Sequence, residues 1–141
     1  MTASLETRVL VSAMSVYFLC ALLTGVWKYR WMMRAPGHQA PVYVDIAHRA
    51  SLQYSFACLV LMVLAQWCVW PQTLRLAAIA ALLLFFTSAI ATYIALGFIN
   101  RTDNQFRRRT LTTTLGMWLL IAGEVGGFAV LASGALVGVW R

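Results

Sequence analysis

The sequence predicts an all-α integral membrane protein built as one bundle of four transmembrane helices. Of its 141 residues, 62% are hydrophobic and only 11% are charged, whereas soluble domains average roughly 45–50% apolar and about 25% charged residues. Its long apolar stretches also match a hydrocarbon core, which takes about 20 helical residues to cross. A β-barrel is disfavoured, because these stretches lack the alternation of barrel strands. At this length we expect a single domain, residues 1–141.

The expected helices follow one another with short polar connections, at about residues 9–27, 46–70, 74–99 and 111–140. No small-residue cleavage site follows the first stretch, so we interpret it as an uncleaved helix. The longest connection, about residues 28–45, contains prolines and a glycine and is expected to form a lid-like loop. Asp45 would then be the N-cap of the second helix, and His48 would lie in its first turn.

Glycines in the fourth stretch predict a close helix contact. Gly123 and Gly127 are four residues apart, as are Gly134 and Gly138. Small residues at this spacing let helix backbones approach each other inside a bilayer. We therefore expect this helix to pack closely, within the chain or between subunits.

The net charge of +7 is expected to set the topology rather than to bind nucleic acid. Basic residues concentrate around the first and third connections: Lys28, Arg30, Arg34, Arg49, Arg101 and Arg107–Arg109. By the positive-inside rule, both connections face the cytoplasm and both termini lie outside. The expected location is a bacterial inner membrane, with the lipid bilayer itself as a partner.

Two ionisable positions inside or beside the spans are candidate functional residues, because a charge in a membrane is costly. Glu124 falls near the middle of the fourth stretch, where it would be protonated or paired with Thr87, Ser88, Gln53 or Tyr17. His48 falls near the cytoplasmic mouth of the second helix. A structural hydrogen bond and a functional acid remain open for Glu124.

His48 is the candidate metal ligand. Its helix face continues through Ser51 and Ser55 and becomes apolar further in, which suits a large flat ligand with a polar edge. A haem b has that shape, and arginines such as Arg49 and Arg101 pair well with its propionates. The alternative is that His48 only caps the helix, or bonds Asp45 or a loop carbonyl.

The histidine count favours an open iron site if haem is bound. The chain has two histidines, His38 and His48, so a second axial ligand would have to be His38 from the first connection or a methionine such as Met14, Met62 or Met117. An iron with a free position binds a substrate atom. Tyr54, Tyr93 and Asn100 are the candidate catalytic residues that would hold a substrate oxygen. Alternatively, Tyr93 is an interface anchor and Asn100 a C-cap.

The motifs "APGHQAP", "DIAHRASL", "TLRL" and "ATYIALGFIN" together resemble the styrene oxide isomerases from about residue 36 to 140. Those are four-helix membrane enzymes that hold a b-type haem through a histidine and convert epoxides to aldehydes. The resemblance implies His48 as proximal ligand, Tyr93 as a substrate-orienting residue, and a homo-oligomer, specifically a trimer. The family has an asparagine where this chain has Tyr54, and Tyr93 matches with a one-residue shift.

"HRAS" also resembles the start of a haem-bearing helix in succinate dehydrogenase cytochrome b anchors. Three hypotheses follow. The first is a haem-dependent isomerase that uses a five-coordinate iron as Lewis acid on a small hydrophobic epoxide. The second is a haem-bearing electron-transfer or anchor subunit. The third is a haem-free membrane module or transporter centred on Glu124.

Overall fold

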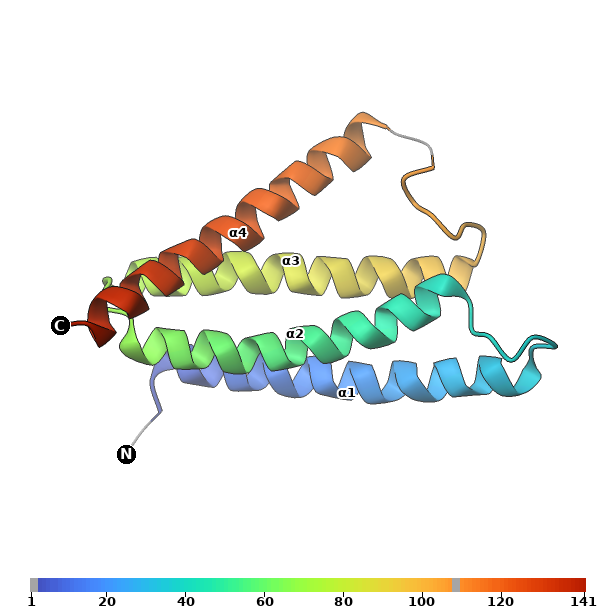
Figure 1. The fold of residues 1–141 in the computed structure, drawn as a ribbon, viewed down its shortest axis with the longest axis horizontal. Helices are drawn as coiled ribbons and strands as arrows, with labels where there is room; N and C mark the ends of the chain where they lie inside the picture. Colours follow the sequence, from blue (N-terminus) through green and yellow to red (C-terminus); the bar gives the residue numbers. More distant parts are fainter. Residues whose placement is uncertain (1–2, 108–109) are drawn as a thin grey trace.

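The computed structural model describes residues 3–107 and 110–141, and this part of the chain forms four α-helices (Figure 1). They are α1 (Leu5–Arg34), α2 (Val42–Trp67), α3 (Gln72–Ile99) and α4 (Leu111–Val139). All four are long and apolar enough to cross a membrane, judged by length and composition. The predicted all-helical architecture is confirmed.

The first connection is much shorter than the sequence suggested. α1 continues to Arg34, because the Trp, Met and Arg residues after position 27 tolerate or favour helix. Only residues 35–41 remain between α1 and α2, so the expected lid of about eighteen residues was wrong.

The start of α2 also differs from the expectation. Pro41 occupies the N-cap position, where its missing N–H costs nothing, and Asp45 lies within the first helical turn. The predicted N-cap role of Asp45 was therefore wrong, and His48 lies in the second turn. Asp45 still stabilises the helix start, because a carboxylate there meets the positive end of the helix dipole.

The closest helix pair is α1 and α2, and small side chains make that approach possible. Ala21 of α1 and Ala47 and Ser51 of α2 are at most 1% exposed. The Ser51 hydroxyl donates to the Ala47 carbonyl at 2.8 Å, and the Ser55 hydroxyl donates to the Leu52 carbonyl at 2.6 Å. Both serines therefore satisfy their donors within α2 and present little bulk to α1.

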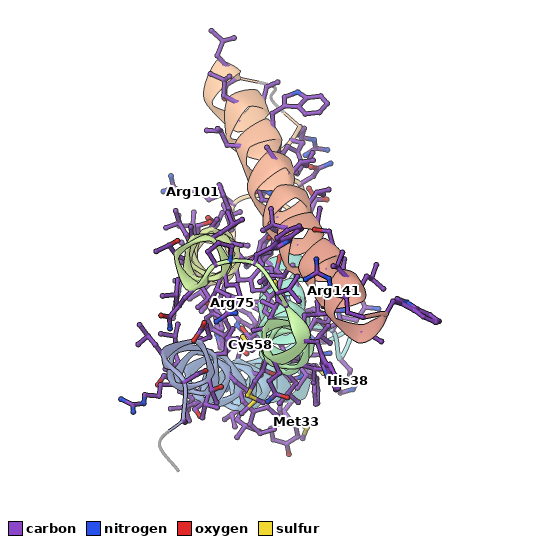
Figure 2. The ribbon with its side chains drawn as sticks, turned by 90° about the vertical axis from the view of Figure 1, so that its left-hand side faces the viewer. Met33, His38, Cys58, Arg75, Arg101 and Arg141 are labelled. Carbon is purple, nitrogen blue, oxygen red and sulfur yellow. The ribbon has the colours of Figure 1, made fainter. Side chains whose placement is uncertain are left out.

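A buried polar cluster ties the start of α1 to the start of α3. Glu6 is only 2% exposed and accepts from Arg75 at 2.7 and 3.1 Å. Arg75 also donates to the carbonyls of Cys68 and Trp70, both at the α2–α3 connection. Figure 2 shows Arg75 at the centre of this end of the bundle, between the helices.

α4 packs by its second half and leaves the bundle by its first half (Figures 1 and 2). A side chain at Gly127 would press on Leu82 and the Ala78 carbonyl, and one at Gly138 would collide with the Trp67 carbonyl. The predicted close contact of the glycine face is confirmed within the chain. Among the described residues of α4, none before Gly127 is buried.

One end of the bundle collects most of the basic residues, and we call it the basic end. Here α1 ends, α2 begins, α3 ends and α4 begins, at the right of Figure 1. The first half of α4 diverges from α3 at this end. Arg108 and Arg109, part of the predicted basic connection, lie outside the described residues.

Candidate functional site

His48 lies in the interface between α1 and α2 and is half-buried there. Its Nδ1 lies 2.8 Å from the Ala21 carbonyl oxygen of α1. Since a carbonyl can only accept, Nδ1 carries the proton. In the neutral ring Nε2 is then the nitrogen that can accept a hydrogen bond. The ring lies against Gly25, where a Cβ would come within 3.0 Å of the imidazole. The glycine thus makes room for the histidine between two closely packed helices.

The charged residues near His48 form a separate surface group. The Asp45 carboxylate pairs with Lys28 of α1 at 2.6 Å and with Arg49 at 2.8 Å. The Arg49 side chain is 63% exposed, and Arg101 is exposed beyond the end of α3. Asp45 therefore joins α1 to α2, and Arg49 is turned toward Asp45 rather than toward His48.

The outer face of α1 and α2 carries an apolar groove deeper than His48. Its volume is about 500 Å³. It is lined by Met14, Ser15, Phe18, Leu19, Leu22, Ser55, Phe56 and Leu59. Ser55 and Leu59 belong to the helix face that continues from His48, so the groove follows the predicted line of that face.

A second cavity opens where α4 diverges from α2 and α3. It has a volume of about 360 Å³ and is bounded by these three helices and the connection that precedes α4. Its polar lining residues are Tyr54, Ser88, Thr92, Tyr93, Gln105 and Thr113, and the apolar ones are Ala89, Phe106, Gly116, Met117 and Leu120. By exposed area most of this wall is apolar, and an apolar wall with convergent polar groups is typical of small-molecule sites.

Tyr54 and Glu124 lie together between α2 and α4. The Tyr54 hydroxyl donates to Glu124 Oε1 over 3.4 Å, a long and therefore weak bond. The Tyr54 ring stacks on Phe86 of α3, with centroids 4.1 Å apart. Glu124 is thus paired, but with Tyr54 and not with Thr87, Ser88, Gln53 or Tyr17 as the sequence had suggested. Tyr17 donates elsewhere, to the Leu83 carbonyl of α3.

Tyr93 lines the same cavity from α3 and is positioned by a neighbouring tyrosine. Its ring stacks with that of Tyr43, with centroids 6.2 Å apart. The Tyr43 hydroxyl accepts from the Gln105 backbone N–H at 2.6 Å. Tyr43 therefore anchors the connection that closes the cavity, and it holds Tyr93 beside it.

Asn100 has a structural position, as the alternative interpretation had it. It is the C-cap of α3 in the left-handed conformation, with φ of 46°, and its backbone N–H donates to the Leu96 carbonyl. Asparagine is one of the few residues besides glycine that adopt this conformation readily. Asn100 is exposed and is not among the residues that line the cavity.

The structure thus divides the predicted site residues into two groups. Tyr54 and Tyr93 line the same cavity, and Glu124 is bonded to Tyr54. His48, on the helix face of the buried Ser51 and Ser55, instead lies at the Ala21 carbonyl of α1. His48 and Tyr54 are six residues apart, which places them about 120° apart around the helix. The two groups therefore point to different neighbours.

Sequence reasoning missed Gln105 and Thr113 at the cavity, Tyr43 behind them, and Glu6 with Arg75 at the opposite end. No spacing in the sequence connects Gln105 to Tyr43. For Glu6 and Arg75 the sequence did offer a signal. Glu6 lies in the first turn of one apolar helix, and Arg75 lies in the first turn of another.

Neither a protein-family model, nor a curated protein, nor a solved structure matches this chain. Within the described residues, no three His, Cys, Asp or Glu side chains gather closely enough to hold a metal ion. A haem needs only one protein ligand. The lack of a three-residue cluster therefore does not test haem binding.

Proposed function

We propose that this chain is an integral membrane protein, with its basic end on the cytoplasmic side, that binds a small apolar molecule bearing one oxygen atom. The cavity between α2, α3 and α4 is the binding site. The observation that carries the proposal is the convergence of Tyr54 and Tyr93 on one cavity of about 360 Å³. Glu124 is bonded to Tyr54 and does not line this cavity.

The polar groups of the cavity suit a hydrogen-bond acceptor. Tyrosine hydroxyls donate one hydrogen bond and can rotate to meet a ligand. The Tyr54 hydroxyl has only a long bond to Glu124, so it can turn toward a ligand oxygen at little cost. An epoxide or carbonyl oxygen would accept from Tyr54 and Tyr93, while Met117 and Leu120 contact the apolar part.

The surroundings of the cavity support entry from the bilayer. The first half of α4 is not buried against the other helices in the described residues, so the cavity is bordered by a loosely packed helix. A bilayer concentrates apolar molecules, and a lateral opening would admit them without passage through water. The predicted substrate class, a small hydrophobic epoxide, fits both this route and the lining.

The first prediction tests this cavity with styrene oxide as the probe. Tyr54→Phe removes a donor and keeps the stacked ring, so we expect binding to weaken by about 5- to 10-fold, the value of roughly one hydrogen bond. Ligand-observed NMR on detergent-purified protein would measure the affinity. Tyr29→Phe is the matched control, because Tyr29 is 61% exposed on α1.

Glu124→Gln keeps the size of the side chain and replaces the carboxylate that competes with the ligand for the Tyr54 hydroxyl by a weaker acceptor, so binding should not weaken. The exposed Asp103 provides its control in Asp103→Asn. Unchanged affinity in Tyr54→Phe would contradict the proposal, because the ligand would then not accept from the Tyr54 hydroxyl.

A second candidate function is haem binding through His48, and the hydrogen bond from its Nδ1 to the Ala21 carbonyl favours it. Histidines that bind metals commonly donate their other ring N–H to a carbonyl, which fixes the ring and directs the second nitrogen to the metal. The apolar groove that follows the same face offers a surface for a macrocycle. When bound, the haem would supply a Lewis-acidic iron for an epoxide isomerase, or a redox centre for an electron-transfer subunit.

His48 lies against α1, whereas Tyr54 and Tyr93 line the cavity beside α4. This separation weighs against a haem-dependent isomerase in which His48 and the tyrosines act on one substrate. Tyr54 and Tyr93 line a cavity that does not include His48. Arg49 is paired with Asp45. His48 would hold the haem, and the α1–α2 groove, whose lining does not include His48, would have to accommodate the macrocycle. The tyrosines line another cavity, so their proposed substrate-orienting role does not depend on haem.

The second prediction is spectroscopic. If His48 binds haem, protein expressed with added haem shows a Soret band that disappears in His48→Ala and persists in His38→Ala, since His38 lies in the exposed first connection. A high-spin ferrous spectrum would favour an open iron site, and sharp low-spin bands would favour electron transfer. Colourless protein would exclude both haem functions.

A further inference from the structure

The last three turns of α1 form a groove that combines arginines with tryptophans. The groove has a volume of about 420 Å³ and is lined by Leu23, Val26, Trp27, Arg30, Trp31 and Arg34. These residues recur at intervals of three or four, so they share one helix face. This groove is separate from the cavity of Tyr54 and from His48.

The lining changes in a fixed order along the helix. Leu23 and Val26 are apolar and lie furthest from the basic end, and Trp27, Arg30, Trp31 and Arg34 follow, so that each tryptophan precedes an arginine. Tryptophan favours the membrane–water interface, with apolar side chains on its bilayer side and charges on its water side. The groove thus has the polarity profile of one lipid molecule, from acyl chain to headgroup.

The two arginines have no acidic partner among the described residues. Asp45, at the same end of α1 and α2, is already paired with Lys28 and Arg49. Asp103 lies near Arg107, at 4.0 Å. Like charges four residues apart on a helix repel each other, so an anion between Arg30 and Arg34 would relieve a local repulsion.

The wall of the groove is held in place by α3. The Trp27 ring stacks on Phe98, with centroids 4.4 Å apart. Gly97 makes room for the Trp27 ring, because a Cβ there would come within 2.8 Å of it. A preformed wall lowers the entropic cost of binding a ligand.

We propose that this groove binds the phosphate group of an anionic phospholipid between Arg30 and Arg34, with the acyl chains along Leu23 and Val26. Arginine pairs with phosphate through parallel hydrogen bonds. An anionic headgroup is favoured over a zwitterionic one, because it lacks the choline cation that two arginines would repel. Basic grooves at the cytoplasmic ends of transmembrane helices are known to select anionic headgroups. The apolar lower part distinguishes a lipid from free phosphate, which could use only the arginines.

The test is native mass spectrometry of the full chain with phosphatidylglycerol, phosphatidylcholine or inorganic phosphate as the probe. We expect phosphatidylglycerol to bind more tightly than phosphatidylcholine. Arg30→Gln/Arg34→Gln should weaken the phosphatidylglycerol complex by about 25-fold, roughly five-fold per arginine. Each single variant should show a partial loss, which keeps the test informative if the double variant folds poorly.

The matched control is Arg107→Gln/Arg141→Gln, which removes the same charge from two exposed arginines outside the groove. This control should retain phosphatidylglycerol binding within about two-fold, because exposed charges outside the groove contribute little. If both double variants lost phosphatidylglycerol binding equally, the loss would reflect the net charge of the protein and not the groove, which would overturn the proposal. Equal affinity for phosphatidylcholine, or displacement of the lipid by inorganic phosphate, would overturn it as well.

Discussion

At the scale of single residues, neighbours in space decide which polar side chains could act together. Tyr54 and Glu124 are 70 residues apart in the sequence and yet share a hydrogen bond of 3.4 Å. His48 and Tyr54 are close in sequence and yet face different helices. Glu6 and Arg75 show the same principle at the opposite end, where a carboxylate only 2% exposed has its counter-charge on another helix.

The third prediction concerns the ion pair of Glu6 and Arg75. Glu6→Gln leaves the Arg75 guanidinium without its counter-charge in a largely buried place, so we expect the free energy of unfolding to fall by about 3–5 kcal/mol. Thermal unfolding of the detergent-purified protein, followed by circular dichroism, would measure the change.

Asp103→Asn is the control for Glu6→Gln, because Asp103 is 68% exposed and its pair with Arg107 spans 4.0 Å. Exposed pairs of this kind contribute about 0–1 kcal/mol. A Glu6→Gln protein as stable as the wild type would mean that Arg75 is held by the carbonyls of Cys68 and Trp70 alone.

At the scale of elements, the contact of α4 depends on where its glycines lie. Gly127 is pressed against Leu82 and the carbonyl of Ala78, while its neighbour Gly126 has open space in place of a side chain. The two glycines have the same intrinsic helix preference, so any difference between their substitutions must come from packing. The α4 contact is therefore specified by one helix face and not by composition alone.

Alanine substitutions at these two positions give a matched pair. Gly127→Ala should destabilise the protein by about 1–3 kcal/mol, because its methyl group would lie 3.0 Å from a backbone oxygen that cannot move aside. Gly126→Ala should be neutral or stabilising by up to about 1 kcal/mol, since alanine favours helix more than glycine. Equal effects in thermal unfolding would contradict the assigned packing face.

At the scale of the whole molecule, the asymmetric packing of α4 creates the candidate site. Its second half is fixed against α3 and the α2–α3 connection, and its first half diverges (Figure 1). The resulting cavity brings together residues from three helices and one connection. The basic end also carries the arginine–tryptophan groove of α1, so the proposed ligand site and the proposed lipid site lie on different faces of the same end.

The sequence by itself determined the four apolar helices, the close glycine face of α4 and the concentration of arginines at one end. These features are local, because helix length, spacing and charge can be read without knowledge of neighbours. It also supplied both interpretations of Asn100, of which the C-cap agrees with the structure. The first connection was misjudged, because tryptophans and methionines after residue 27 resemble an interfacial loop as well as a helix end.

Only the tertiary structure decided which polar residues meet. The rotation of α2 turns His48 toward Ala21 and Gly25 of α1, and Tyr54 toward Phe86 and Glu124. That rotation is set by small residues such as Ala47 and Ser51, which let α1 approach on one side, and by the divergence of α4 on the other. Pairings between helices depend on the register of several surfaces at once, and a single sequence carries no local signal of that register.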